Sequence, residues 1–214
     1  MISQDKLQIR RRNMWQLWIL IAVFAMPLIA AWLFYFNPQW LPQGRTNNGT
    51  LIDPPRGMES LVLQTRERGN FDWNLMRDKW TLTILTEGRC DDQCIEQLIK
   101  ARQIRRALGA DRERVERLLI LLPDAAGNLE LPSLDGLGGT SLAVATMAKK
   151  PAIRDVFSAD ERGIEKSLFI IDPRVDLMMV HDMSHITSKQ ILQDLEKLLK
   201  ASQSWAKGGQ YGHN

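Results

Sequence analysis

The longest apolar run in the chain extends from Met14 to Phe36 and contains no charged residue. At about 1.5 Å of rise per residue, a helix of this length reaches roughly 34 Å, enough to cross a hydrocarbon core of about 30 Å. Pro27 lies near its middle, where membrane helices tolerate proline because neighbours and local adjustments satisfy the freed carbonyl. The pattern predicts one transmembrane helix over residues 14–36.

The rest of the chain alternates short apolar runs with amphipathic segments. Residues 37–56 are rich in Pro, Gly and Asn without any period, which is typical of a linker, and a domain is expected from Gly57. The pattern predicts strands over residues 61–63, 80–86, 118–122, 167–171 and 177–180, with helices over residues 94–108, 141–150 and 187–201. Residues 203–214 are expected to form a flexible tail.

The order of these elements predicts the fold class. A helix between the strands at 80–86 and 118–122 implies a right-handed parallel βαβ unit. The strands at 167–171 and 177–180 are joined by a turn around Pro173, which predicts an antiparallel hairpin. The order β, α, β, α, β, β, α is that of a thioredoxin-like α/β domain, expected over residues 57–202.

The charges that flank the apolar run predict its orientation. Lys6 and the arginines at 10–12 precede the run, whereas the next 20 or so residues carry only Arg45 and Arg56. This asymmetry predicts a cytoplasmic segment over residues 1–13 and a domain in the periplasm of a bacterial inner membrane. A cleaved signal peptide, with Ala30-Ala31 as its site, is the rival interpretation. The length of the run and the aromatic residues near its end favour the uncleaved anchor.

Net charge excludes one class of partner. The chain holds 28 Lys and Arg against 25 Asp and Glu, and removing the four basic and one acidic residue of positions 1–13 leaves 24 of each. The exported part is therefore neutral, and no basic stripe with interleaved aromatics remains to bind nucleic acid.

Cys90 and Cys94 lie four residues apart where a predicted strand leads into a predicted helix. The N-terminus of a helix offers free N–H groups and a positive dipole end, which favour a thiolate. The two sulfurs can converge on one another or on a soft metal ion, and an oxidising compartment permits a disulfide. A purely structural disulfide, or a pair of inert thiols, is the alternative.

Three short motifs resemble the Sco/SenC family of membrane-anchored, thioredoxin-like proteins that help to deliver copper to cytochrome c oxidase. The family carries K-W-T-L, then C-P-D-x-C-P, and later I-D-P-x-G; the corresponding segments here are residues 79–82, 90–94 and 170–173. The resemblance implies a role in cytochrome c oxidase assembly, with Cys90 and Cys94 as a redox-active pair or as copper ligands. It implies an oxidase subunit or another assembly factor as the partner.

The chain departs from the family pattern at several positions. Asp91 and Ile95 replace the prolines that flank the cysteine motif, and Val175 replaces the glycine of the turn. The copper-binding histidine of the family would fall at Ile164, and residues 162–167 contain no histidine.

A substitute metal ligand is available in the segment 178–185, which holds His181 and His185 among three methionines. Imidazole and thioether are both acceptable to copper. On a thioredoxin-like sheet, however, this segment lies about two strand spacings, roughly 10 Å, from the cysteine loop. The alternative is that Met178 or Met179 packs in the core and the two histidines cap the turn into the last helix.

Two other functions remain open. A general thiol-disulfide oxidoreductase would share the fold, but such enzymes use Cys-x-x-Cys and a proline before the next strand, which residues 164–167 lack. A non-catalytic binding module that has lost the metal site is the third hypothesis. No Ser, His and acid arrangement is recognisable, and Gly136–Gly139 lacks the Lys-Ser/Thr of a phosphate loop, so no hydrolase or transferase is predicted.

The predicted orientation is testable with a reporter enzyme fused after Leu199. We expect a reporter that works only in the periplasm to be active, because the basic residues precede the apolar run. The full-length protein should fractionate with the inner membrane. A reporter active only in the cytoplasm would contradict this orientation.

Overall fold

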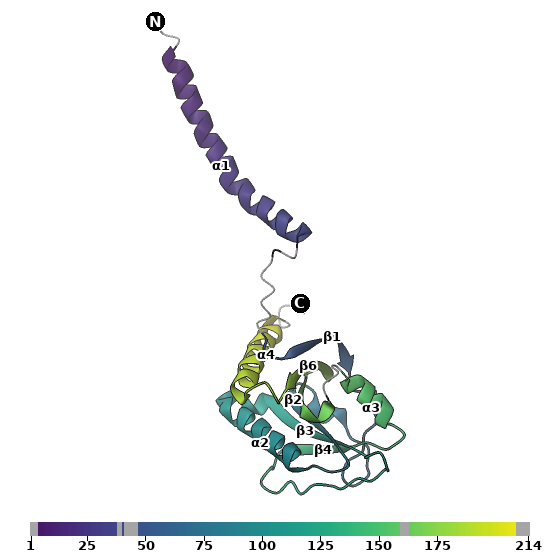
Figure 1. Cartoon of the computed structure of the whole chain (residues 1–214). Coiled ribbons are helices and arrows are strands. Elements are labelled where there is room, and N and C mark those ends of the chain that lie inside the picture. The colour runs from purple at the N-terminus through teal and green to yellow at the C-terminus, as the bar shows by residue number, and fades with distance from the viewer. Residues whose placement is uncertain (1–3, 38–39, 41–46, 159–162, 209–214) are drawn as a thin grey trace, which may run out of the picture. The chain divides into compact units, whose positions relative to one another are not determined.

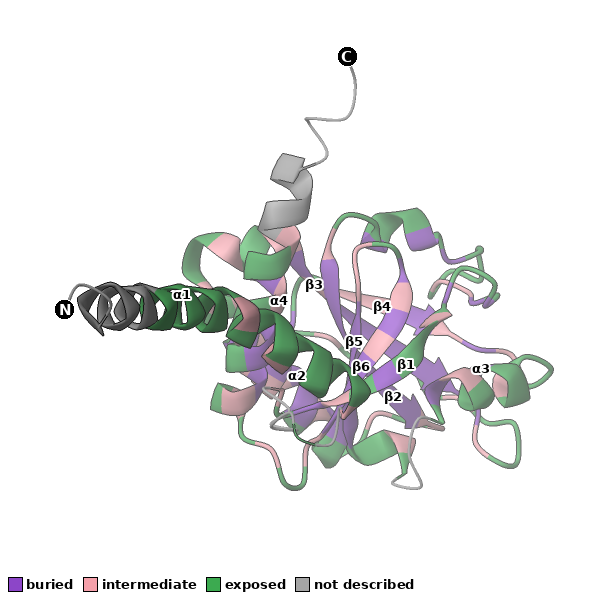
Figure 2. Ribbon diagram, turned by 90° about the horizontal axis from the view of Figure 1, so that it is seen from above, coloured by how far each residue is buried: buried purple, intermediate pink, exposed green. Residues whose placement is uncertain are grey.

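The computed structural model describes residues 4–37, 40, 47–158 and 163–208, and the chain forms two compact units, residues 1–46 and 47–214. The first unit contains α1 (Gln4–Phe36), a single helix with Pro27 inside it. Its segment Met14–Phe36 has a mean hydropathy of 2.5, and none of it is buried (Figure 2). This helix is long and apolar enough to cross a membrane, as the sequence predicts, while its orientation stays a prediction.

The second unit is built on a six-stranded sheet with the order β1-β6-β5-β2-β3-β4 (Figure 1). The strands are β1 (Thr50–Gly57), β2 (Trp80–Glu87), β3 (Val115–Leu122), β4 (Thr140–Val144), β5 (Ser167–Ile171) and β6 (Asp176–Asp182). β2, β3 and β4 run parallel, whereas β5 is antiparallel to both β2 and β6. The predicted parallel βαβ unit and the predicted hairpin are therefore both present.

Helices cover both faces of this sheet. α2 (Asp92–Ala107) and α4 (Ser188–Gly208) pack on one face, and α3 (Lys150–Phe157) packs on the other with the segment that leads from β1 to β2. Residues of β2 contribute to the hydrophobic cores on both faces of the sheet. Leu82 and Ile84 lie in the core under α2 and α4, whereas Leu85 lies in the core on the α3 face. Burial of each such side chain stabilises the fold by about 1.5–3 kcal/mol.

The prediction of a linker up to residue 56 and a first strand at Leu61–Leu63 was wrong. The structure places a strand, β1, at Thr50–Gly57, where it pairs antiparallel with β6 and forms an edge of the sheet. Pro54 and Pro55 are tolerated there because an edge strand need not donate every N–H, and the pairing is irregular between Leu51 and Arg56. Of the predicted linker, residues 38–39 and 41–46 lie outside the described residues.

The helix predicted over residues 141–150 was also wrong. β4 occupies Thr140–Val144, and the helix α3 begins only at Lys150, with Pro151 in its first turn. The run of Leu, Ala and Met residues has good helix propensity, but parallel pairing with β3 decides its structure.

The first part of the tail predicted over residues 203–214 is helical instead. α4 continues to Gly208, and residues 209–214 lie outside the described part of the chain.

The turn between β5 and β6 has Val175 at the position that the sequence analysis assigned to the glycine of the Sco/SenC pattern. Val175 adopts a left-handed φ of 68°, a rare conformation for a β-branched residue, and its side chain is fully buried. The carboxylate of Asp172 accepts N–H groups from Arg174 at 2.8 Å and from Asp176 at 2.9 Å. Packing and these hydrogen bonds therefore hold the turn.

Candidate functional site

The candidate site begins where β2 ends. Gly88 turns the chain with a left-handed φ of 69°, and a Cβ at this position would lie 3.2 Å from Cβ of Asp124. The amide of Gly88 donates to the carbonyl of Leu122 at 2.8 Å, which ties the turn to the end of β3. Backbone conformation and the close approach of Asp124 both favour glycine here, so the chain leaves the sheet at a fixed point and leads directly to Cys90.

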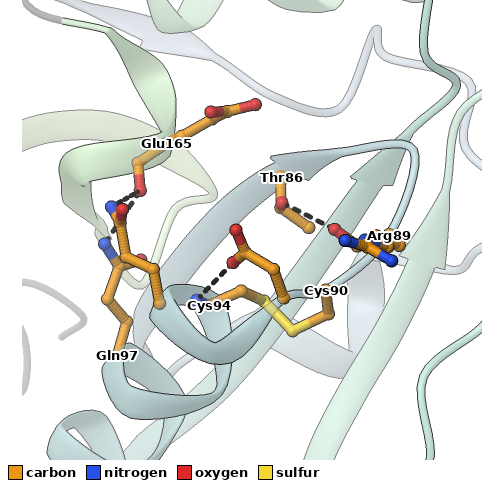
Figure 3. The surroundings of a disulfide bond; sticks show 8 residues. Thr86, Arg89, Cys90, Cys94, Gln97 and Glu165 are labelled. Atoms are coloured by element: carbon orange, nitrogen blue, oxygen red, sulfur yellow. Dashed lines mark hydrogen bonds between the residues drawn. A yellow bond between two sulfur atoms is a disulfide. The ribbon is translucent and has the colours of Figure 1, made fainter.

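Cys90 and Cys94 form a disulfide with a Cα–Cα separation of 5.2 Å (Figure 3). Cys94 lies in the first turn of α2 and is only 3% exposed, packed in the core between the sheet, α2 and α4. Cys90 lies in the loop before the helix and is partly exposed. Of the two residues, Cys90 is thus the one that a partner can reach more easily.

Asp91 caps the helix that carries Cys94. Its backbone is extended, and its Oδ1 accepts the amide N–H of Cys94 at 3.0 Å. Its carbonyl accepts the N–H of Ile95 at 2.9 Å, the first hydrogen bond of the helix. The loop is held on its other side by Thr86, whose hydroxyl donates to the carbonyl of Arg89 at 3.1 Å (Figure 3). The disulfide therefore sits in a loop that is fixed at both ends.

Two polar hollows flank the disulfide. The larger has a volume of about 380 Å³ and is lined by Arg89, Cys90, Asp91, Asp92, Glu130 and Pro132. The second reaches Cys94 from the side of Glu87 and Glu165. Glu87 is held in an ion pair with Lys150 at 2.8 Å, so this carboxylate serves the structure. Charged and polar linings of this kind suit a polypeptide partner better than an apolar small molecule.

The segment that would carry the histidine of the Sco/SenC family lies against the start of α2. Gln97 and Gln93 donate to the carbonyl of Glu165 at 2.8 Å and 3.2 Å, and Gln97 is shown with Glu165 in Figure 3. The neighbouring residue is Ile164, whose partly buried side chain packs against the core on the α3 face of the sheet.

His181, a predicted alternative metal ligand, is fully buried on the α4 side of the sheet. Its Nε2 donates to Oδ2 of Asp194 at 3.1 Å. Asp194 also accepts the N–H groups of Asn48 at 2.7 Å and Gly49 at 2.9 Å. A Cβ on Gly49 would lie 2.6 Å from the imidazole, so only glycine allows this approach. Through Nε2 the ring helps to hold β6, α4 and the start of the domain together, while its Nδ1 is buried without a hydrogen-bond partner among the described residues.

The pKa values of His181 and Asp194 are both lowered, but for different reasons. Burial lowers the pKa of His181, and the hydrogen bond and charge of Asp194 only partly offset it. Burial alone would raise the pKa of Asp194, but hydrogen bonds from Gly49, His181 and Asn48 outweigh it and lower the pKa. At neutral pH the pair is a neutral imidazole that donates to a carboxylate.

His185 lies at the surface. Its side chain is 81% exposed, and its Nε2 is 3.9 Å from a carboxylate oxygen of Asp182. Met179 packs in the core at 1% exposure. Among the described residues, no three His, Cys, Asp or Glu side chains are grouped so that they could hold a metal ion. Neither histidine therefore joins the cysteine pair, and the donor set does not fit a three-ligand copper site.

The sequence analysis did not predict the roles of Asp194 and Asp91. Asp194 is thirteen positions beyond His181 in another element, and no sequence pattern links them. Asp91 was noted only as a replacement for proline, although an Asp directly before a helix is a common N-cap and predicts this role.

Comparisons with known proteins support the fold. A family model described as "Transmembrane-like, thioredoxin-like, C-terminal domain" matches residues 80–202. No curated protein matches the sequence.

Solved structures of Sco proteins share the architecture. The apo Sco1 protein from Thermus thermophilus has a TM-score of 0.54 and 15% identity over 73% of this chain and 99% of its own. Yeast Sco1 with copper bound has a TM-score of 0.51 and 12% identity over 73% of this chain and 95% of its own. At these identities the likeness concerns the fold, and the predicted thioredoxin-like fold is confirmed.

The lowered pKa of His181 predicts a loss of stability in weak acid. As the pH falls through about 6.5, His181 binds a proton in the unfolded chain but not in the folded protein. The free energy of unfolding therefore falls by at most about 1.4 kcal/mol per pH unit. His181→Gln should lack this decrease, and it should be less stable than the parent at pH 7.5 by about 1–3 kcal/mol.

Urea unfolding of residues 47–214 at pH 7.5, 6.0 and 5.0 measures the difference. His185→Gln is the matched control, because its side chain is exposed, and it should keep the parent's pH dependence. Equal pH dependence in the parent and His181→Gln would show that His181 takes up its proton in the folded protein.

The donor set also predicts how the reduced domain handles Cu(I). We expect one Cu(I) to bind weakly through Cys90 and Cys94, because two thiolates suit a soft ion but no third His, Cys, Asp or Glu is grouped with them in the described part of the chain. Competition titrations should show a loss of binding in Cys90→Ser/Cys94→Ser. His181→Ala and His185→Ala should bind like the parent, whereas a drop in either variant would identify a recruited ligand.

Proposed function

Because this chain belongs to the family of transmembrane-like, thioredoxin-like C-terminal domains, we propose that it is a membrane-anchored thiol-disulfide protein that acts in cytochrome c oxidase assembly. The observation that carries the proposal is the disulfide between a partly exposed Cys90 and a buried Cys94, at the point where β2 leads into α2. The motifs shared with Sco/SenC proteins support the oxidase as the pathway and an oxidase subunit or another assembly factor as the partner.

The different exposure of the two cysteines assigns their roles. In the reduced pair, the thiolate of Cys90 attacks a disulfide of the partner, which forms a mixed disulfide and releases one partner thiolate. Cys94 then attacks Sγ of Cys90, which forms the internal disulfide and releases the second partner thiolate. Two electrons pass to the partner, and the protons lost by the two cysteines end on its two thiols.

Geometry favours thiol exchange over copper delivery. Both reactions need two cysteines, but stable copper binding gains from a third ligand, and no His, Asp, Glu or further Cys is grouped with this pair among the described residues. Copper delivery therefore remains the second candidate, supported by the Sco/SenC motifs alone. A general oxidoreductase would use the same chemistry on many clients, and the non-catalytic module would leave the pair unreactive.

The proposed location is the bacterial inner membrane, with the domain in the periplasm. Supporting it are an apolar helix at Met14–Phe36 and the basic residues that precede it. An oxidising periplasm would allow the disulfide to form, and a separate reductant would be needed to regenerate the dithiol.

The unequal roles of the two cysteines are testable in a strain that lacks the chromosomal copy. We expect Cys94→Ser to accumulate a mixed disulfide through Cys90, because the resolving thiol is gone. Cys90→Ser should accumulate little, because Cys94 is 3% exposed. Both variants should lower cytochrome c oxidase activity, whereas His185→Ala, a surface control, should restore it.

Non-reducing electrophoresis and mass spectrometry of the adduct identify the client, and an oxidase subunit or assembly factor supports the proposed pathway. Alkylation mass shifts on the wild-type protein should show cycling between disulfide and dithiol. If the cysteine variants restore full oxidase activity, the non-catalytic binding module replaces this proposal.

A further inference from the structure

Arg117, on β3, is a buried cation whose hydrogen-bonding capacity is only partly used. It lies between Val115 and Leu119, which belong to the core under α2 and α4, so the alternation along a strand puts its side chain on that face of the sheet. Arg117 is 2% exposed, and its Nη2 donates to the carbonyl of Gly138 at 2.6 Å. Its Nε and Nη1 are buried and have no hydrogen-bond partner among the described residues. A buried charge in this state is costly, so the group requires a counter-ion.

Arg102, on α2, approaches the same loop. Its Nη1 donates to the carbonyl of Gly136 at 2.5 Å, and its Nε is also buried without a partner in the described part of the chain. The Cα atoms of Gly136 and Gly138 can be at most about 7 Å apart, so the two guanidinium groups lie beside one short segment. Six buried side-chain nitrogen and oxygen atoms lack a partner among the described residues, and three of them belong to these two arginines. The unused donors are therefore concentrated at one place.

The charges around Arg117 are mostly positive. Burial lowers the pKa of Arg117, the charges of Arg105 and Arg102 lower it further, and Glu116 offsets only part of this effect. Glu116 itself is paired with Lys79 at 2.8 Å. The surroundings thus favour the arrival of an anion beside Arg117.

A hollow of about 350 Å³ opens beside Arg102, between α2 and the loop that leads from β3 to β4. Ile99 and Leu137 give it an apolar part, and Ser133 and Asp135 give it a polar part. The carboxylate of Asp135 accepts the hydroxyl of Ser133 at 2.6 Å and belongs to an exposed residue. The hollow is therefore a route from solvent to the arginines, with room for a small molecule that has an apolar body.

We propose that Arg102 and Arg117 bind a phosphate group, either free or as the monoester of a small molecule whose body occupies this hollow. Guanidinium groups offer paired N–H donors that match phosphate oxygens, and such charge-assisted hydrogen bonds are about twice as strong as neutral ones. The double negative charge of phosphate also suits two arginines better than one carboxylate would. The site uses neither cysteine, so it does not depend on the proposed function.

Entry of the phosphate requires the loop to move, because the unpartnered nitrogens are buried. Phosphate oxygens would take the places of the carbonyls of Gly136 and Gly138 on the two arginines. Gly136 and Gly139 adopt left-handed φ values of 74° and 78°, and a Cβ on Gly139 would lie 3.4 Å from Nη2 of Arg117. Glycine at these positions gives the loop its conformation and leaves room for the guanidinium group.

The experiment compares full-length wild type with Arg102→Gln, Arg117→Gln and Arg106→Gln in a non-ionic detergent. Arg106→Gln is the matched control, because it removes the same charge from an exposed residue of the same helix. Equilibrium dialysis with radiolabelled inorganic phosphate measures binding. Thermal unfolding in phosphate and in chloride at equal ionic strength measures the linked change in Tm.

We expect the wild type to bind one phosphate saturably, and its Tm to rise with phosphate but not with chloride. Arg102→Gln and Arg117→Gln should each weaken binding by about ten- to hundredfold, as expected for the loss of a hydrogen bond to a charged group. Arg106→Gln should weaken it by less than about threefold. Competition with propyl phosphate distinguishes the sources: tighter binding than inorganic phosphate supports a monoester with an apolar body, and equal or weaker binding supports free phosphate.

Three results would overturn the inference. Absence of saturable binding in the wild type would mean that the arginine nitrogens meet water alone. Unchanged binding in both Arg102→Gln and Arg117→Gln would reveal an adventitious ion only, and an equal loss in Arg106→Gln would reveal an effect of general charge. If Arg117→Gln fails to fold, Arg102→Gln decides, because the side chain of Arg102 is partly exposed.

Discussion

The candidate site depends on the burial of β2 on both of its faces. The strand lies between β5 and β3, and all of its residues except the last are buried. Its pairing with β3 is continuous from Trp80 opposite Val115 to Glu87 opposite Leu122. A strand enclosed in this way cannot present side chains to a partner along its length. Reactive groups can be offered only beyond its end, and the turn at Gly88 places Cys90 and the start of α2 there.

The elements that the sequence predicts are those in which buried apolar residues recur at regular spacing. The strands β2, β3, β5 and β6 and the helices α2 and α4 all contribute regular apolar positions to the two cores. The prediction failed where pairing with a neighbouring strand determines the structure. β1 is an edge strand that contains two prolines, and β4 has the composition of a helix. Leu61 and Leu63 alternate with an exposed Val62 like a strand, yet this segment packs as a loop, and the two isolated bridges beside it are both made by Gln64.

Some features of the candidate site could likewise be predicted from the sequence, and others could not. The spacing of Cys90 and Cys94 and their place before a helix are legible from the sequence, and the structure brings the two sulfurs together. The role of His181 could not be predicted, because its partners Asp194 and Gly49 come from distant parts of the chain. A histidine near methionines suggests a metal, whereas a buried carboxylate opposite the ring gives it a structural role. Only the tertiary arrangement distinguishes these cases.

The carboxylate of Asp194 also has a mechanical consequence. Asn48 and Gly49 lie just before the edge strand β1, at the start of the domain, and both donate their N–H groups to this carboxylate. A pull on the chain ahead of Asn48 is therefore resisted by α4 and by β6 through His181, before any tension reaches the interior strands. The disulfide lies at the end of β2, with β6 and β5 between it and β1. Tension in the chain ahead of Asn48 is thus borne by the buried, hydrogen-bonded pair of His181 and Asp194 at the rim of the sheet, and it bypasses the loop that holds the reactive sulfurs.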